Sequence, residues 1–312
     1  MRNKLLMSLG YCVFISIVSV FSQNIENPMP ALSNRNPNQK QERTLPNTQR
    51  GERQKSNPRS NNYFPFKVKR DKEQEQRLKP NPDDLTKHAT FLKDSKTGIF
   101  RLFNDLDCES NVYVIKVDEA CQSSIPGGAF YSFREKEYTT AYLADIRFKQ
   151  GLLISDGALS QNMLVNLGDM PLENVSLETD GIKYLTGFVP ETVNTSVSRQ
   201  FVEIVKGVKD GKHEYRKVLP AFNNTTYALR VIAYRGSFYR NFRGWIFNLL
   251  EGDKRVDVII TFRIIRKDED GNVTILWKEL DRKKSPKMEY EKKNKKNQKP
   301  APVISNKTMA EG

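Results

Sequence analysis

The chain has 312 residues, of which 38% are hydrophobic, and it carries a formal net charge of +14. Its negative mean hydropathy predicts that part of it does not fold into a domain. Residues 86–280 contain 26 basic and 25 acidic residues, so the excess charge lies outside them. A nucleic-acid-binding domain concentrates Lys and Arg on the folded unit itself, so this distribution argues against a nucleic-acid partner.

The N-terminus has the features of an export signal. Arg2 and Lys4 precede an apolar run over residues 5–20, and Val20-Phe21-Ser22 offers a cleavage site. The run is shorter than the roughly 20 residues of a membrane-spanning helix. We therefore expect a signal peptide over residues 1–22 and a secreted or periplasmic (extracytoplasmic) protein. Because Phe21 is bulky for a cleavage site, an uncleaved N-terminal anchor is the alternative.

Two segments lack the periodic apolar residues that a folded core requires. Residues 23–82 are rich in Asn, Pro, Gln, Arg and Lys, and residues 281–312 are rich in Lys. We predict a disordered basic linker and a disordered Lys-rich tail. Such tails can attach a protein to anionic glycans or to a membrane surface. A purely solubilising tail fits the same composition.

Two cysteines, Cys108 and Cys121, remain after the leader. In an exported chain, an oxidising compartment favours a disulfide between them. Their separation of thirteen residues and the lack of a nearby histidine argue against a metal or redox pair. We therefore predict a structural disulfide bond.

Residues 255–280 carry the strongest secondary-structure pattern. Alternating apolar residues on both sides of an Asp-Gly turn at 268–272 predict an antiparallel hairpin. These residues are Val256, Val258, Ile260, Phe262 and Ile264 before the turn, and Val273, Ile275 and Trp277 after it. A second hairpin is predicted over residues 141–155, with its turn at Gln150-Gly151.

The remaining pattern also favours antiparallel strands. Asp-Gly pairs tolerate the positive φ of tight turns; they begin at Asp156, Asp180, Asp210 and Asp270. Further strands are predicted at 98–103, 111–117, 129–134, 215–219 and 226–234. Short helices are predicted after a cap at Asp83 and over residues 191–206, where apolar residues recur every four positions.

These elements predict a mainly β fold. We expect an antiparallel β-sandwich-like single domain over residues 83–280, with one or two short helices and flanking disordered basic tails. A partly closed barrel is the competing architecture.

One segment, residues 234–245, interleaves aromatic rings and guanidinium groups. Aromatic faces stack on sugar rings, and arginines bind carboxylates, sulfates or phosphates. The candidate ligand-binding residues are Arg235, Tyr239, Arg240, Phe242, Arg243 and Trp245. The alternative is a connecting loop whose aromatic rings fold back onto the core while its arginines lie along the surface.

The sequence contains none of the common catalytic motifs. It has no nucleophile elbow, zinc-protease helix, phosphate-binding loop or dinucleotide fingerprint. Its two histidines are expected to be a packing residue, His88, and a solvated residue, His213. Asp268, Asp270 and Asn272 resemble the start of a calcium loop, but the closing acidic ligand is missing. We predict no metal site and no cofactor, and we nominate no catalytic residue.

These observations lead to two functional hypotheses. The first is an exported, non-catalytic binding or structural protein of the cell envelope or extracellular space, whose ligand the sequence does not identify. The alternative is a carbohydrate-active or other hydrolase, because residues 86–280 hold enough acidic residues to supply a carboxylate pair.

Overall fold

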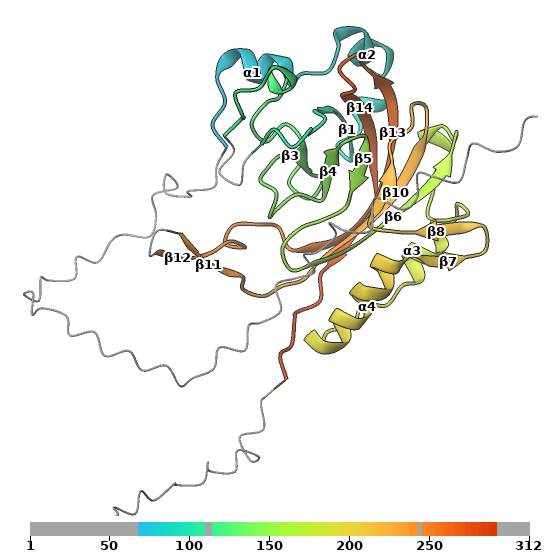
Figure 1. Cartoon of the computed structure of the whole chain (residues 1–312). Helices are drawn as coiled ribbons and strands as arrows, with labels where there is room; N and C mark the ends of the chain where they lie inside the picture. The colour runs from blue at the N-terminus through green and yellow to red at the C-terminus, as the bar shows by residue number, and fades with distance from the viewer. Residues whose placement is uncertain (1–67, 110–113, 243–244, 292–312) are drawn as a thin grey trace, which may run out of the picture. The chain divides into compact units, whose positions relative to one another are not determined.

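The computed structural model describes residues 68–109, 114–242 and 245–291, all within one compact unit; the side chains of Phe242 and Trp245 are not described (Figure 1). The predicted signal peptide, most of the predicted linker and most of the predicted tail lie outside these residues. Within them the strands pair antiparallel in two five-stranded sheets and two small hairpins. The predicted mainly β fold is confirmed.

The large sheet contains the hairpin predicted from residues 255–280. Its strands, in spatial order, are β1 (Thr97–Leu102), β14 (Val273–Lys284), β13 (Val256–Lys267), β10 (Thr226–Ala233) and β6 (Ser160–Gly168). The pairing of β13 with β14 runs from Val256 opposite Lys284 to Lys267 opposite Val273. Two register shifts interrupt it, and they add one residue to each strand at separate places.

The small sheet lies against one face of the large sheet. Its strands, in order, are β3 (Glu137–Tyr138), β2 (Phe130–Ser132), β4 (Ile146–Lys149), β5 (Leu152–Ile154) and β9 (Val218–Pro220). β4 and β5 form the predicted second hairpin. Gln150 and Gly151 at its turn have φ of 50° and 77°, the left-handed values that match the twist of two-residue hairpins.

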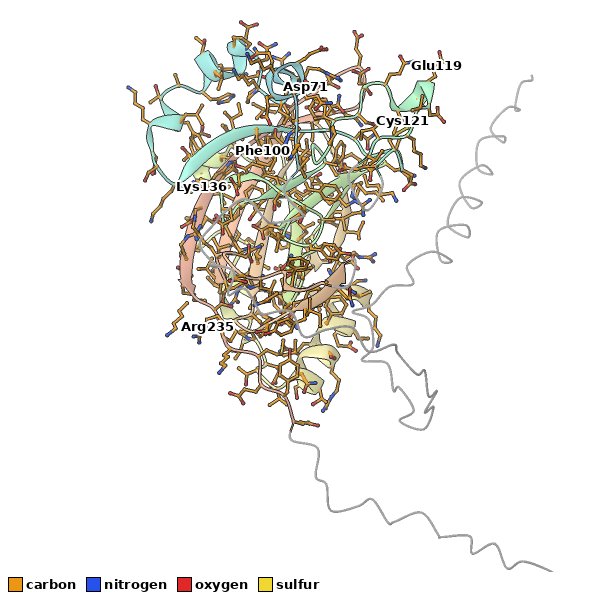
Figure 2. All side chains as sticks on the ribbon, turned by 90° about the vertical axis from the view of Figure 1, so that its left-hand side faces the viewer. Asp71, Phe100, Glu119, Cys121, Lys136 and Arg235 are labelled. Carbon is orange, nitrogen blue, oxygen red and sulfur yellow. A yellow bond between two sulfur atoms is a disulfide. The ribbon has the colours of Figure 1, made fainter. Side chains whose placement is uncertain are left out.

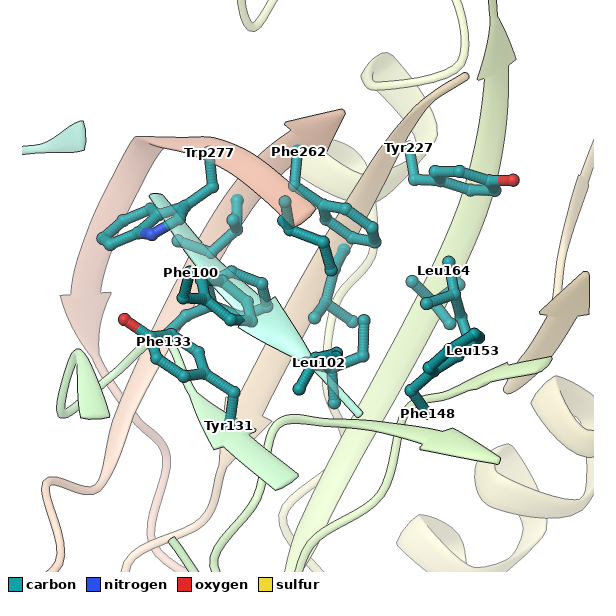
Figure 3. Packing of buried hydrophobic residues seen from close by; sticks show 14 of the residues in the cluster. Phe100, Leu102, Tyr131, Phe133, Phe148, Leu153, Leu164, Tyr227, Phe262 and Trp277 are labelled. Carbon is teal, nitrogen blue, oxygen red and sulfur yellow. The ribbon is translucent and has the colours of Figure 1, made fainter. Parts of the chain in front are cut away.

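A shared hydrophobic core joins the two sheets (Figure 3). Phe100 of the large sheet stacks on Tyr131 of the small sheet with ring centroids 3.6 Å apart. Phe133 lies edge-on to Trp277 at 5.5 Å and faces Phe262 at 5.8 Å. Because residues from facing strands fill one buried layer, the arrangement is that of a β-sandwich.

Helices cover the opposite face of the large sheet (Figure 1). These are α3 (Lys183–Gly187) and α4 (Asn194–Lys206), the latter being the helix predicted over residues 191–206. Val197 and Ile204 of α4 are buried in a second core with Ile232 and Ile259 of the sheet. Every residue of β10 is therefore buried, because both faces of this strand are covered.

The folded part begins before the predicted boundary at residue 83. Helix α1 (Lys72–Arg77) starts with a capping box formed by Asp71 and Gln74. Leu78 after it is buried against Phe103 and Ile125. Helix α2 (Pro82–Lys87) is capped by Asn81 rather than by Asp83. The described residues thus contain four α-helices, more than the one or two that the sequence predicted.

The folded part also continues past residue 280. β14 extends to Lys284, and residues 285–291, named here the C-terminal strap, follow it. In the strap, Met288 N donates to Arg235 O at 2.9 Å, and Glu289 O accepts from Asn194 N at 2.9 Å. The strap therefore connects the end of β10 with the first turn of α4.

The predicted disulfide bond is present between Cys108 and Cys121, with sulfur atoms 2.05 Å apart. The strand predicted between them is not formed in its described part. Ile115 makes one isolated bridge with Glu109, and residues 110–113 lie outside the described residues. A 3₁₀-helix (Glu119–Cys121) leads into the second cysteine; two others are Phe91–Lys93 and Leu172–Asn174.

Only two of the four Asp-Gly pairs close hairpins. Gly211 joins β7 (Val208–Asp210) to β8 (His213–Tyr215), and Gly271 joins β13 to β14. Gly157 and Gly181 also have positive φ, but they lie in longer connections. Of the helices in the described part, none combines the length and apolar character needed to cross a bilayer.

Candidate functional site

The candidate binding segment forms a hairpin rather than an irregular loop. Strands β11 (Tyr239–Phe242) and β12 (Trp245–Asn248) pair with Tyr239 opposite Asn248 and Phe242 opposite Trp245. Figure 1 shows this hairpin apart from both five-stranded sheets. In the sequence, Gly244 separates the two strands.

Two large apolar side chains on the hairpin are exposed to solvent. Tyr239 is 63% exposed and Ile246 is 71% exposed. The register places residues 239, 241, 246 and 248 on the same face of the hairpin, because side chains alternate along each strand. Tyr239 was a candidate from the sequence, whereas Ile246 was missed. The apolar run Trp245-Ile246-Phe247 after Gly244 was the available signal, because such a short run is consistent with a strand.

The guanidinium of Arg240 packs between aromatic rings. It lies 4.9 Å from the ring centroid of Phe238 and 5.6 Å from that of Tyr142, in the segment before β4. Its buried Nε has no hydrogen-bond partner, and no carboxylate among the described residues pairs with it. Arg240 therefore fixes the hairpin against the small-sheet side by cation–π contact.

Of the other candidates from the sequence, the structure describes the side chain of Arg235 but not those of Phe242, Arg243 and Trp245. Arg235 lies after β10, at the end of the described unit away from Asp71 and Cys121 (Figure 2). Its Nε donates to Ser285 O at 2.8 Å, so this guanidinium holds the C-terminal strap. Arg243 lies outside the described residues, and for Phe242 and Trp245 the structure describes the paired backbone.

Backbone and side-chain bonds close the base of the hairpin. Asn248 Oδ1 accepts from the backbone N–H groups of Phe238, at 3.0 Å, and Leu250, at 3.3 Å. Leu249 N donates to Phe238 O at 2.8 Å. Leu249 and Leu250 are both buried. The hairpin thus leaves the body of the protein from a fixed base.

Below this base lies a buried network of two arginines and two aspartates. Arg134 Nε donates to Asp145 at 2.6 Å, and its Nη1 donates to Asp253 at 2.7 Å. Arg255 Nη1 donates to the same Asp253 oxygen at 2.7 Å. Burial lowers the pKa of Arg134, but the two aspartates outweigh burial and raise this pKa above its ordinary value. Arg134 therefore remains charged and ties the small sheet to the connection between β12 and β13.

The buried aspartates are held by arginines, which gives them structural roles. Asp84 pairs with Arg266, Asp105 with Arg147, Asp145 with Arg134, and Asp257 with Arg230. Asp268 of the calcium-like turn binds Arg101 at 2.6 Å and accepts from Asn272 N. Within the described ranges, no cluster of His, Cys, Asp and Glu has the geometry of a metal site.

Among the carboxyl groups of the described residues, Glu109 is the one whose pKa is raised. Burial, followed by the charge of Asp105, raises its pKa to about 7 against the lowering effect of the Gly127 N–H group. The N–H of Gly127 donates to Glu109 Oε1 at 2.8 Å. The cavity beside this pair has a volume of about 10 Å³, which suits at most one water molecule. The space beside Glu109 is therefore too small for the sugar ring that a carbohydrate-active hydrolase would have to bind.

The raised pKa of Glu109 predicts a pH-dependent stability. In the unfolded chain this carboxyl has an ordinary pKa of 4.5, so the folded state binds more protons between pH 4.5 and about 7. Stability is therefore lost as the pH rises through this window. We expect Glu109→Gln, which cannot ionise, to gain about 2–3 kcal/mol relative to the wild type between pH 5 and pH 8.

Urea unfolding at the two pH values measures this difference. The exposed residue Glu178 provides the control, because Glu178→Gln should leave the pH dependence of stability unchanged. Equal pH dependence in the wild type and in Glu109→Gln would contradict the assignment.

The two histidines have different surroundings. His88 follows α2 and is half-buried, as expected; burial lowers its pKa, followed by the charge of Lys87. His213 is not the solvated residue that the sequence suggested. Its Nε2 lies 3.2 Å from Asp180, and its ring packs so closely against Gly181 that a Cβ there would come within 2.9 Å.

The fold and the hairpin define a disulfide-bonded, mainly β protein with a projecting two-stranded element. Comparison with protein-family models, with curated proteins and with solved structures found no match. The functional argument therefore rests on this chain's own residues.

Proposed function

We propose that the protein is an exported, non-catalytic binding protein of the cell envelope or extracellular space, and that it contacts its ligand through the β11–β12 hairpin. The observation that carries this proposal is the exposure of Tyr239 and Ile246 on a hairpin with a fixed base. Large exposed apolar side chains that share one face are typical of a contact surface. Holding the base before the ligand arrives lowers the entropy lost on binding.

Two features support an extracytoplasmic location. The N-terminal residues have the charge and apolar pattern of an export signal. The bond between Cys108 and Cys121 is of the kind that persists in oxidising compartments. The Lys-rich C-terminal residues would add electrostatic attachment to an acidic polymer or surface.

Anionic glycans are the ligand class that we propose. The hairpin exposes a tyrosine ring on one face, while Arg240, on the other face, and Arg243, between the strands in the sequence, give the same segment positive charge. An aromatic face stacks on a sugar ring, while a guanidinium donates to carboxylate or sulfate oxygens. A glycan carrying acidic groups presents both features together.

A binding measurement with a heparin oligosaccharide tests this proposal. We expect the double variant Tyr239→Ala/Ile246→Ala to bind at least about tenfold more weakly at 0.15 M salt, because the exposed apolar face is lost while Arg240 still holds the hairpin. The matched control is Phe222→Ala/Val202→Ala, which removes exposed apolar residues outside the hairpin. It should bind within about twofold of the wild type. Equal affinity of the two double variants would refute the hairpin as the contact surface.

Deleting the Lys-rich C-terminal residues measures their contribution to binding separately from that of the hairpin. Removing residues 292–312 should reduce the salt dependence of binding, because fewer lysines neutralise the ligand. Loss of all binding in this deletion, with no effect of the hairpin variant, would assign the ligand to the tail instead.

A further inference from the structure

A cavity of about 290 Å³, open to solvent on one side, lies between α3, α4 and the start of β7. It is separate from the β11–β12 hairpin and from the small cavity beside Glu109. Its apolar wall consists of Tyr184, Phe188, Ile204 and Val208. Its polar lining includes Glu191, Ser196, Arg199, Gln200 and Glu203. The cavity thus combines aromatic surface with charges of both signs.

Several contacts hold the apolar wall in place. Tyr184 packs against Tyr215 of β8 with ring centroids 4.4 Å apart. Arg230 of the large sheet donates to the carbonyl oxygens of Leu185 and Phe188, which fixes the backbone on either side of the wall. The cavity is therefore formed before any ligand binds.

Part of the polar wall is also held in place. Gln200 of α4 donates to Val189 O and accepts from Glu191 N, both at 3.0 Å. These two bonds hold residues 189–191 against the helix and set the position of Glu191 at the cavity. The side-chain nitrogen and oxygen of Gln200 are therefore both already bonded to the protein backbone.

Two opposite charges line this cavity without pairing. The structure contains many ion pairs within 4.0 Å, but none between Glu191 and Arg199, and neither pairs with another described residue. Glu203, one turn along α4 from Arg199, is held by Lys206 at 3.0 Å. Glu191 and Arg199 are therefore the charges that remain to meet a ligand.

We propose that this cavity binds a free α-amino acid with an apolar side chain. Its ammonium group would face Glu191, its carboxylate would face Arg199, and its side chain would lie on Tyr184, Phe188 and Ile204. A guanidinium suits a carboxylate because it donates two parallel hydrogen bonds. The volume of about 290 Å³ is just below that of typical small-molecule sites, which are about 300–1,000 Å³, so it suits a ligand as small as a free amino acid.

Calorimetric titration of the full chain with three related compounds tests the proposal. L-phenylalanine carries both charges, L-phenylalaninamide lacks the carboxylate, and 3-phenylpropionate lacks the ammonium group. We expect L-phenylalanine to bind about tenfold more tightly than either analogue. Absence of L-phenylalanine binding up to about 10 mM, or equal binding by one analogue, would overturn the proposal.

Charge-removing variants assign each group to its partner. Arg199→Gln should weaken binding of L-phenylalanine about tenfold and leave L-phenylalaninamide unaffected. Glu191→Gln should weaken L-phenylalanine and leave 3-phenylpropionate unaffected. Lys183→Gln, an exposed change on α3 outside the cavity lining, is the control and should change neither affinity. Unchanged L-phenylalanine binding in both cavity variants would also overturn the proposal.

This site is independent of the glycan-binding proposal. Glu191 and Arg199 are exposed, so their substitution should preserve the fold, which circular dichroism checks. The hairpin variants should bind L-phenylalanine normally, and the cavity variants should bind the heparin oligosaccharide normally. Each proposal can therefore fail without the other.

Discussion

Replacing Arg134 with methionine is expected to lower the free energy of unfolding by about 3–5 kcal/mol. The substitution removes the cation that Asp145 binds, and it leaves Asp253 with Arg255 alone. Asp145 and Asp253 are each only 1% exposed, so water cannot replace the lost hydrogen bonds. The penalty comes from leaving a buried carboxylate without its cation, more than from the attraction lost.

Urea unfolding, followed by circular dichroism, measures the effect of Arg134→Met. The control is Arg216→Met, because the ion pair of Arg216 with Glu214 is partly exposed, at 47% and 35%, and should change stability by less than about 1 kcal/mol. Adding Asp145→Asn to Arg134→Met should recover part of the loss, since a neutral amide costs less to bury than a carboxylate. A loss below about 1 kcal/mol for Arg134→Met would contradict this account.

Replacing Arg230 with methionine is expected to destabilise the protein by a similar amount, about 3–5 kcal/mol. Arg230 Nε and Nη2 donate to the two oxygens of Asp257 at 2.9 and 2.7 Å. Its Nη1 donates to the carbonyl oxygens of Leu185 and Phe188. Without Arg230, Asp257 keeps only Lys283, whose Nζ is 3.9 Å away, and the end of α3 loses its donors.

Arg230→Lys distinguishes the charge from the geometry. An ammonium restores the charge but cannot donate to two carboxylate oxygens and two carbonyl oxygens in one plane, so we expect only partial recovery. Lys206→Met on α4, where both partners of the ion pair are 65% exposed, is the control. Hydrogen exchange should show faster exchange in α3 of the Arg230 variants. Full stability of Arg230→Lys would show that charge alone suffices.

The sequence predicted the elements whose pattern is local. β13 and β14 alternate strictly around an Asp-Gly turn, so their pairing followed from the residues alone. It did not predict that helices cover the second face of the large sheet. β10 reads Thr-Tyr-Ala-Leu-Arg-Val-Ile-Ala, and both faces of this strand are buried. Arg230 in that apolar run was a usable signal, because a buried arginine requires a partner.

The candidate site was predicted less completely than the fold. The sequence located Tyr239 and Arg240 as candidates but did not predict that residues 239–242 pair with residues 245–248 in a hairpin. It gave no indication of the cavity beside α4, because Tyr184, Arg199 and Val208 come from three separate elements. Such a site depends on tertiary packing, which local periodicity does not encode.

The C-terminal strap determines which bonds would break first if the chain were pulled from its C-terminal side. Force applied at Glu291 and directed away from the domain would first act on the bonds from the strap to Arg235 and Asn194, and only then on β14. These few bonds would break before the long pairing of β13 with β14 began to separate. The strap would therefore detach and extend at a lower force than the force that separates the strands of the sandwich.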